Sequence, residues 1–339
     1  MSSTSLYGRR IRAKRMALWT MIVTTLVFAL ITLFVGRYPK PGFSLPLDWS
    51  DNAMTRSIYL RVRLPRIILA LLAGSMLSAS GYAFQMLFSN PLVEPGFLGV
   101  SQGSAFGAAF MIVLGASSTI AVQVSAIFFG LLALLASYLL AQRFRFGGWL
   151  LRLVLSGIAV SAIFSSALAA IKLVAEPTKD LQDITFWMMG GLWNATWRQL
   201  LSILPLTLLS MVIIVSQRWK LNLLSLGERS SFSVGVHPKR DRTLLLIVAT
   251  VGTTLVISIT GLIGWVGLIT PHLARKLFGS ESSFSLPASM VGGSFFLLAS
   301  DTLGRTLLAA EIPIGLVTSL FGAIIFIIIL SMRQQEGKA

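Results

Sequence analysis

Apolar windows of about 20 residues recur along the whole chain, and they constrain its fold more than any other feature. A helix needs roughly 20 predominantly apolar residues to cross the hydrocarbon core of a bilayer. Ten such windows can be placed between the polar segments: 16–36, 67–88, 97–114, 119–141, 153–175, 199–216, 243–259, 262–278, 284–303 and 312–331. The sequence therefore predicts an all-α, polytopic integral membrane protein with about ten transmembrane helices, forming a single domain over residues 1–339.

The overall composition supports the same class. Hydrophobic residues make up 55% of the chain and charged residues only 12%, with a mean hydropathy of +0.81, which lies beyond the range of soluble domains. The polar segments, of which 37–62 and 218–242 are the longest, are too short to enclose a separate core. The chain has no cysteine, which excludes disulfides and thiolate metal ligands.

Positive charge is concentrated ahead of the first window. The basic residues there are Arg9, Arg10, Arg12, Lys14 and Arg15. By the positive-inside rule they place a short N-terminus, residues 1–15, in the cytoplasm, and ten spans return the C-terminus to the same side. Topology thus accounts for much of the net charge of +16 without a nucleic-acid partner. The first window is too long for a signal peptide, and no small-residue cleavage site follows it.

The sequence contains no recognisable set of catalytic residues. No Gly-x-x-x-x-Gly-Lys-Ser/Thr phosphate-binding loop is present, and the two histidines, His237 and His272, have no carboxylate or cysteine cluster around them. We therefore expect no enzyme activity, cofactor or metal in this chain. An ion-coupled secondary transporter remains an alternative, but it would need ionisable residues deep within a span, whereas the charges here fall at predicted span ends. A non-transporting membrane scaffold is a third possibility.

Two polar regions are candidates for contact with partners. Arg63 and Arg66 precede the second window on the outer side, and Arg305 ends the ninth window on that side. They are either anchors that reach to the lipid headgroups or a positive platform for an acidic partner. Segment 218–242, on the inner side, predicts two brief amphipathic helices separated by glycines. It either rests on lipid headgroups or docks a cytoplasmic partner.

Three further motifs carry helix-breaking residues. Asn90-Pro91 ends the second window and predicts a packed elbow. Trp187 to Gly191 follows an external loop and is typical of an interfacial aromatic belt or of an adaptable pathway wall. The stretch from Gly261 to Arg275 contains Pro271 and His272 in an otherwise apolar region, so neighbouring helices must cover it.

In this order and spacing, the motifs resemble the iron-chelate and vitamin B12 (FecCD-type) permease family of ABC importers, from about Arg61 to Phe326. The residues that match the signature of the family are Asn90, Pro91, Gly267, Pro271, His272, Arg275, Asp301 and Pro313. The resemblance implies a type II ABC importer permease with ten spans in each subunit.

The resemblance also implies roles for particular residues. It implies that Arg63, Arg66 and Arg305 dock a substrate-binding protein. Coupling to the ATPase falls to Leu221, Asn222, Leu226, Gly227, Glu228 and Gly235. The translocation pathway and gate fall to Leu150, Leu151, Ser156, Gly157, Met188, Met189, Gly190 and Gly191. Three positions depart from the family: Leu150 and Leu151 replace small polar residues of the vitamin B12 permease, and Ile324 stands where proline is usual.

The assembly implied by the resemblance is an importer in the bacterial inner membrane. Two permease subunits, as a homodimer or a pseudo-symmetric heterodimer, would bind two cytoplasmic ATPase subunits that carry ATP and Mg²⁺. An external binding protein would deliver the substrate. An iron(III)-siderophore is the expected substrate, with haem, cobalamin and oxyanions such as molybdate as alternatives.

Overall fold

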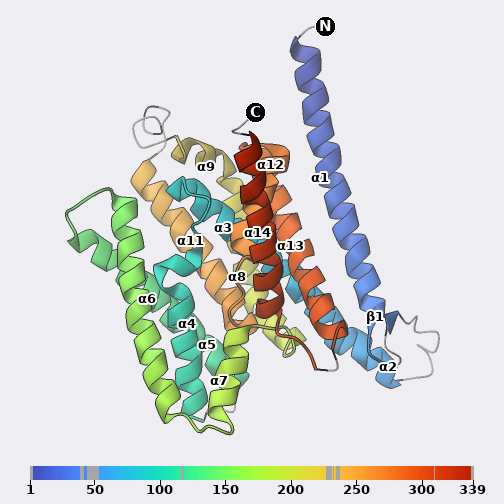
Figure 1. Ribbon diagram of the computed structural model, residues 1–339, viewed down its shortest axis with the longest axis vertical. Coiled ribbons are helices and arrows are strands. Elements are labelled where there is room, and N and C mark those ends of the chain that lie inside the picture. Colours follow the sequence, from blue (N-terminus) through green and yellow to red (C-terminus); the bar gives the residue numbers. More distant parts are fainter. Residues whose placement is uncertain are drawn as a thin grey trace.

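The structure is a computed structural model that describes residues 3–38, 42–43, 53–115, 118–226, 231, 233, 237–308 and 310–336. Helices account for nearly all of the regular structure in these ranges, and Figure 1 shows them as a bundle of long, roughly aligned rods. The ten predicted windows each coincide with one helix: α1 Ser3–Phe34, α3 Leu64–Phe88, α4 Val100–Val113, α5 Thr119–Arg143, α6 Trp149–Val174, α8 Trp197–Ser216, α11 Pro238–Thr260, α12 Val266–Phe278, α13 Ser282–Thr306 and α14 Ile314–Glu336.

Shorter elements link the long helices. The strands β1 Val35–Gly36 and β2 Gly42–Phe43 form a small antiparallel pair after α1, with Val35 opposite Phe43. The remaining elements are α2 Ala53–Ser57, the π-helix η1 Ile58–Arg63, the 3-10 helix η2 Pro95–Leu98, α7 Asp180–Met189 and α9 Arg218–Leu224.

Seven of the described helices are long and apolar enough to cross a membrane by length and composition. The shorter ones start after breaks in the backbone. The window predicted from residue 262 becomes helical only at Val266, because Gly261 (φ +66°) and Trp265 (φ +73°) adopt left-handed backbone conformations that a right-handed helix cannot contain. Likewise α4 begins at Val100, after η2 and Gly99 (φ +83°). These two helices are therefore only 13 and 14 residues long.

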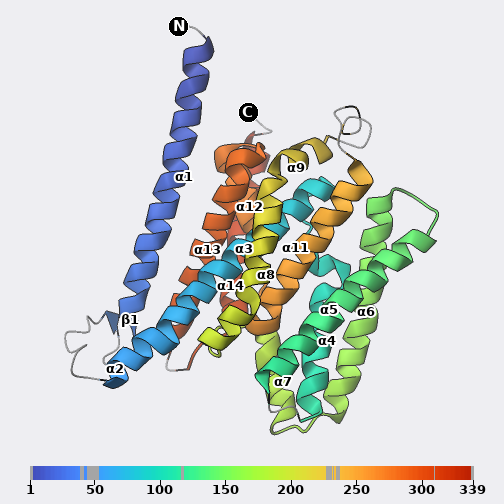
Figure 2. The same cartoon turned by 180° about the vertical axis from the view of Figure 1, so that it is seen from behind.

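Helix α3 forms the centre of the bundle, and 83% of the most apolar window of the continuous helical stretch Ala53–Phe88, which α3 ends, is buried. It packs against α8, α11, α12 and α13 (Figures 1 and 2). Glycines allow this close approach: a Cβ added to Gly74 would collide with the backbone of Gly293 on α13, and one added to Gly81 would collide with Gly267 on α12. Small residues at helix crossings provide the van der Waals contact that holds membrane helices together.

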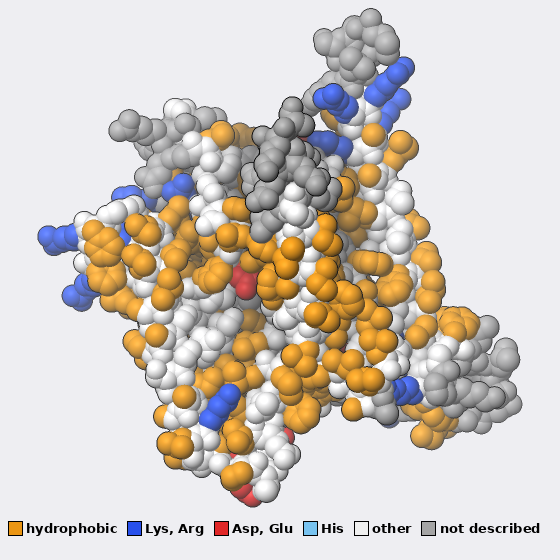
Figure 3. All heavy atoms as spheres, in the orientation of Figure 1, with side chains coloured by type: hydrophobic (Ala, Val, Ile, Leu, Met, Phe, Trp, Pro, Cys, Tyr) orange, Lys and Arg blue, Asp and Glu red, His pale blue; other side chains and the backbone are white. Residues whose placement is uncertain are grey.

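Helix α1 lies at the side of the bundle against α13, and its N-terminal end extends beyond the other helices (Figures 1 and 2). Only 11% of its apolar window is buried, so the rest faces outward, as expected for a lipid-exposed helix. Figure 3 shows hydrophobic side chains over much of the central surface, with Lys and Arg side chains more frequent toward the end where α1 begins. The molecule is a multi-pass membrane protein.

Candidate functional site

The three arginines expected to form an external platform are buried. Arg63, Arg66 and Arg305 are only 6%, 8% and 8% exposed. Arg66 Nε donates to Asp301 Oδ1 at 2.9 Å, and its Nη atoms donate to both carboxylate oxygens of Glu311 at 3.1 and 3.0 Å. The guanidinium therefore joins α3 to α13 and to the segment that leads into α14.

The other two arginines donate to backbone carbonyls at the end of α1 and just beyond it. Arg63 donates to the carbonyls of Leu33 and Tyr38 at 2.8 and 2.7 Å. Arg305 donates to those of Thr32 and Val35 at 2.7 and 2.8 Å. Carbonyls at a helix C-terminus lack partners within the helix, and a guanidinium supplies donors in a fixed fork. In the structure these arginines thus link helices by internal hydrogen bonds, and their role in docking stays a prediction.

Other arginines at this end of the bundle are exposed. Arg56 on α2 and Arg61 on η1 present their side chains to the surface. The sequence singled out Arg63 and Arg66 because they belong to the family motif, and a one-dimensional pattern does not reveal which members of an arginine cluster are buried. If a positive surface meets an acidic partner here, Arg56 and Arg61 are among the exposed residues available for contact.

The coupling segment is anchored at its start and exposed at its end. Leu221 and Leu224 on α9 are fully buried, whereas Leu226 is 65% exposed. Asn222 Oδ1 accepts hydrogen bonds from the backbone N–H and hydroxyl of Ser282 at 3.0 and 2.6 Å, which fixes α9 to the start of α13. The first of the two predicted amphipathic helices is confirmed as α9. Gly227, Glu228, Gly235 and the predicted second helix lie outside the described residues.

Ion pairing and a carbonyl contact also attach α9 to α11. Lys220 Nζ lies 2.9 Å from Asp241 Oδ1, and Arg242 Nη2 donates to the carbonyl of Leu224 at 3.2 Å. Because α9 is tied to both α11 and α13, a displacement of α9 would be transmitted to two helices that pack directly on α3.

The residues predicted to line a pathway do not form one cluster. Leu150 and Leu151 lie at the start of α6, half-buried and exposed respectively. Ser156 and Gly157, further along α6, are buried, and a Cβ on Gly157 would collide with the carbonyl of Phe97 and with Leu98. The position of Gly157 is therefore explained by close packing of α6 on the η2 elbow.

The segment from Met188 to Gly191 lies where the ends of three helices meet. Met188 and Met189 are half-buried, and Gly190 and Gly191 are buried. Gly191 N–H donates to the carbonyl of Thr260 at the end of α11 at 2.7 Å, and Gly315 N–H reaches the carbonyl of Gly190 at 3.5 Å. Gly190 also adopts φ +69°. The glycines are thus required by the backbone junction of α7, α11 and α14.

Most of the signature residues serve packing or pairing. Gly267 lies against Gly81, Pro271 and Pro313 are buried, and Asp301 is fully buried beside Arg66. Asn90 is an exception, since its Oδ1 accepts a hydrogen bond from Leu92 N–H at 3.0 Å and so stabilises the turn after α3. His272 and Arg275 are different again, because they face a pocket.

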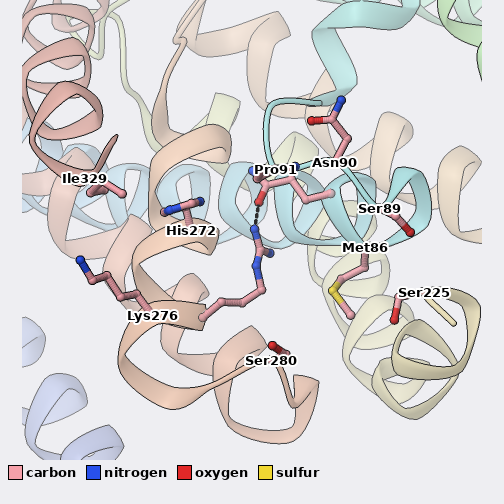
Figure 4. Close-up of a pocket in the computed structure, with 11 residues that line it drawn as sticks. Met86, Ser89, Asn90, Pro91, Ser225, His272, Lys276, Ser280 and Ile329 are labelled. Atoms are coloured by element: carbon pink, nitrogen blue, oxygen red, sulfur yellow. Dashed lines mark hydrogen bonds between the residues drawn. The ribbon is translucent and has the colours of Figure 1, made fainter. Parts of the chain in front are cut away.

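This pocket has a volume of about 460 Å³, and Figure 4 shows it. It is formed where α3, α12 and α14 meet the segments that follow α3, α9 and α12. Its lining consists of Gln85, Met86, Ser89, Asn90, Pro91, Ser225, His272, Arg275, Lys276, Ser280 and Ile329. Sequence reasoning did not identify it, although the spacing of His272, Arg275 and Lys276 places them on one helical face.

Glu94, in the elbow between α3 and η2, is a further residue that sequence reasoning passed over. Burial of this carboxylate raises its pKa to about 7, since desolvation disfavours the charged form. Its surroundings include Gly96 and Gly267, whose added Cβ atoms would lie 3.6 and 3.7 Å from its two oxygens. The ionisation of this elbow therefore changes near neutral pH.

Comparison with known proteins agrees with the motifs and the fold. The model of the FecCD transport family matches residues 21–332. A Helicobacter pylori protein described as an iron chelatin transport system permease is 39% identical over 270 residues, covering 80% of this chain and 81% of its own length. The molybdate import system permease protein MolB of Haemophilus influenzae is 34% identical over 330 residues, covering 94% and 96%.

A solved structure is also similar. It is described as an inward-facing conformation of a metal-chelate type ABC transporter, with a TM-score of 0.86 and 34% sequence identity, and the match covers 94% of this chain and 99% of that chain. The arrangement of helices, the motifs that join them and the family match all indicate the same family. This chain is a member of the FecCD transport family.

Proposed function

We propose that this chain is the membrane-spanning permease subunit of an ATP-driven ABC importer that carries an iron(III) chelate, such as a ferric siderophore, into the cell. The observation that carries the proposal is the family match over residues 21–332, together with the metal-chelate type transporter structure that aligns with 94% of the chain. The H. pylori relative, with 39% identity, supports an iron chelate.

Molybdate is the main alternative substrate. The relative from H. influenzae is 34% identical over nearly the whole chain and is a molybdate permease. Haem and cobalamin are further alternatives implied by the resemblance. Among these importers we expect the external binding protein to set substrate specificity. The substrate can therefore be identified from the small molecule that the binding protein retains on purification. Retention of an iron(III) chelate supports the proposal, and retention of molybdate, haem or cobalamin contradicts this part of it.

The proposed membrane is the bacterial inner membrane, with both termini in the cytoplasm. The basic residues at the start of α1 support this orientation through the positive-inside rule. It places α9 and the pocket on the cytoplasmic side and Arg56, Arg61 and β1 on the outer side, because α9 lies toward the same end of the bundle as the N-terminus of α1, and β1 and α2 lie toward the other end (Figure 1). Accessibility of single introduced cysteines to a membrane-impermeant reagent would test it.

The proposed assembly contains two permease subunits, two ATPase subunits and a binding protein. Exposed apolar side chains along α6 and α14, such as Ile158, Ile163, Leu320 and Ile324, provide a surface for a second copy. ATP and Mg²⁺ would bind to the ATPase subunits, because no phosphate-binding loop occurs in this sequence. Co-purification of the ATPase with the permease, and a subunit count by native mass spectrometry, test this composition.

The contacts of α9 provide a mechanical basis for energy coupling. An ATPase seated on the exposed end of this segment, at Leu226, would act on a helix whose other face is buried and whose Asn222 is bonded to Ser282. Movement of the ATPase on nucleotide binding would then shift α11 and α13 against α3. In this mechanism the chain contributes the pathway and the transmission of force, and the partner contributes hydrolysis.

A further inference from the structure

We propose that the pocket between α3, α9, α12 and α14 receives an acidic side chain of the ATPase subunit, whose carboxylate neutralises Arg275. This inference rests on the proposed function, since it assigns a contact within the assembly. It concerns a site that is separate from the exposed end of the α9 segment, although the two adjoin.

Arg275 is a desolvated cation without a counter-charge in the described part of the chain. Its Nη2 donates to Gln85 Oε1, its guanidinium carbon lies 5.4 Å from the ring centre of Tyr82, and its Nη1 is buried without a hydrogen-bond partner. Of the described residues, none places a carboxylate within ion-pairing distance of this guanidinium. A buried charge is costly unless an opposite charge accompanies it, so this position favours an anionic occupant.

Gln85 keeps the guanidinium in place. Its Nε2 donates to the carbonyls of Gly267 and Leu268 at 3.2 and 3.0 Å, which leaves its Oε1 free to accept from Arg275. The amide of Gln85, on α3, therefore links Arg275 to the first turn of α12. A cation held in this way can pair with an incoming carboxylate at little further cost in side-chain entropy.

The rest of the lining suits a polar group that arrives from the cytoplasmic surface. Lys276 and His272 add positive or hydrogen-bonding groups, and Ser89, Asn90 and Ser280 are exposed polar residues at helix ends. Few apolar side chains, among them Met86 and Ile329, contribute to the wall. A phospholipid would need a longer apolar surface for its acyl chains, so a protein carboxylate fits this pocket better than a lipid headgroup.

The position of Ser225 connects the pocket to the ATPase. Ser225 lines the pocket and directly precedes Leu226, which is 65% exposed at the end of α9. Consecutive Cα atoms are about 3.8 Å apart, so a partner that covers Leu226 also reaches the rim of the pocket. Docking on α9 and neutralisation of Arg275 would then occur in the same contact.

The absence of natural cysteines allows a direct test. Ser280→Cys places one thiol at the exposed rim, and Gly148→Cys places a control thiol in open space at the start of α6. Relative to the control, we expect Ser280→Cys to react about tenfold faster with an anionic than with a cationic methanethiosulfonate reagent. Arg275→Gln should reduce this preference severalfold, with Lys276 supplying the remainder, whereas Arg275→Lys, which keeps the charge, should retain it.

Binding of the purified ATPase gives the second measurement. It should protect Ser280→Cys from both reagents, and Arg275→Gln should weaken ATPase binding about tenfold and reduce its salt dependence. Lys276→Gln, a milder change on the surface of the helix, should act in the same direction if Arg275→Gln does not fold. The inference is overturned if the ATPase binds while Ser280→Cys stays reactive, or if vesicles of phosphatidylglycerol alone protect the thiol. If the wild-type chain binds no ATPase, the proposed function fails as well.

Discussion

Arg66 on α3 and Asp301 on α13 form an ion pair inside the protein, with Arg66 Nη2 2.8 Å from Asp301 Oδ1 and the side chain of Asp301 fully buried. Arg305 Nε lies 3.7 Å from the other oxygen of Asp301, so one carboxylate serves two guanidinium groups. Both arginines belong to the set that the sequence assigned to docking. Their first role in the structure is to hold α1, α3 and α13 together at one end of the bundle.

Loss of one member of this pair should destabilise the fold. We expect Arg66→Met to lower the free energy of unfolding by about 3–5 kcal/mol, because it leaves Asp301 buried and unpaired on that side. Arg66→Met combined with Asp301→Leu should cost less than the sum of the two single changes. Thermal unfolding of the purified variants in detergent measures this, and additive effects would show that the pair contributes little.

Binding-protein docking should depend on the exposed arginines instead. We expect Arg61→Glu to weaken docking and to reduce its salt dependence, since exposed charges act mainly on association and are screened by ions. The melting temperature should stay near that of the wild type, because the side chain lies at the surface. Surface plasmon resonance across a salt series tests this. Unchanged affinity for Arg56→Glu/Arg61→Glu would exclude this surface.

Leu226 and Leu221 should respond differently to the same substitution. Leu226→Asp changes a side chain that is 65% exposed, so the permease should fold but lose ATPase binding and substrate-stimulated hydrolysis. Leu221→Asp puts a charge at a fully buried position and should prevent recovery of folded protein. Size-exclusion profiles and ATPase pull-down distinguish the two. Normal coupling in Leu226→Asp would refute the docking role of this segment.

Gly157 should tolerate no larger side chain. Even Gly157→Ala should cost about 1–3 kcal/mol, because its Cβ would overlap the backbone at Phe97. Ile158→Phe, at a 56% exposed position on the same helix, is the matched control and should leave stability nearly unchanged. The comparison is made by thermal unfolding. A stable Gly157→Phe variant that is blocked only in transport would favour a pathway role over packing.

Stability should fall as pH rises from acidic values toward neutrality, and Glu94 should account for part of this fall. Its pKa of about 7 in the folded protein exceeds the ordinary value of 4.5, so the folded state binds the proton more tightly than the unfolded state. The resulting stabilisation is present at low pH and is lost between about pH 4.5 and 7. Glu94→Gln should flatten this part of the melting profile, while exposed Glu281→Gln should not. An identical profile for Glu94→Gln would contradict the assignment.

The sequence predicted the helices well because the membrane imposes a simple rule. Each window had to be long, apolar and helical, and the predicted break between windows 243–259 and 262–278 is confirmed, since α11 ends at Thr260. The resemblance was likewise confirmed, as the motifs from Arg63 to Pro313 lie in a chain that matches the family over residues 21–332.

The roles of individual side chains were harder to predict, since they depend on contacts between distant parts of the chain. Arg66 is 235 residues from Asp301 along the sequence, and nothing local indicates that its charge is already paired. Gly157 belongs to a recognisable motif, but only the approach of Phe97 explains why glycine is needed there. The pocket around Arg275 draws on residues from Gln85 to Ile329, so its shape exists only in the folded protein.

Uptake into proteoliposomes is the most direct test of ATP-driven import through this chain. The permease would be reconstituted with its ATPase inside the vesicles and its binding protein outside, and accumulation of a ⁵⁵Fe(III)-siderophore would be followed. For an ATP-driven importer we expect accumulation that needs internal ATP, the ATPase and the binding protein together. Leu226→Asp should abolish this accumulation. Accumulation that proceeds without the ATPase, driven by a proton or sodium gradient, would contradict it and would identify the chain as an ion-coupled carrier.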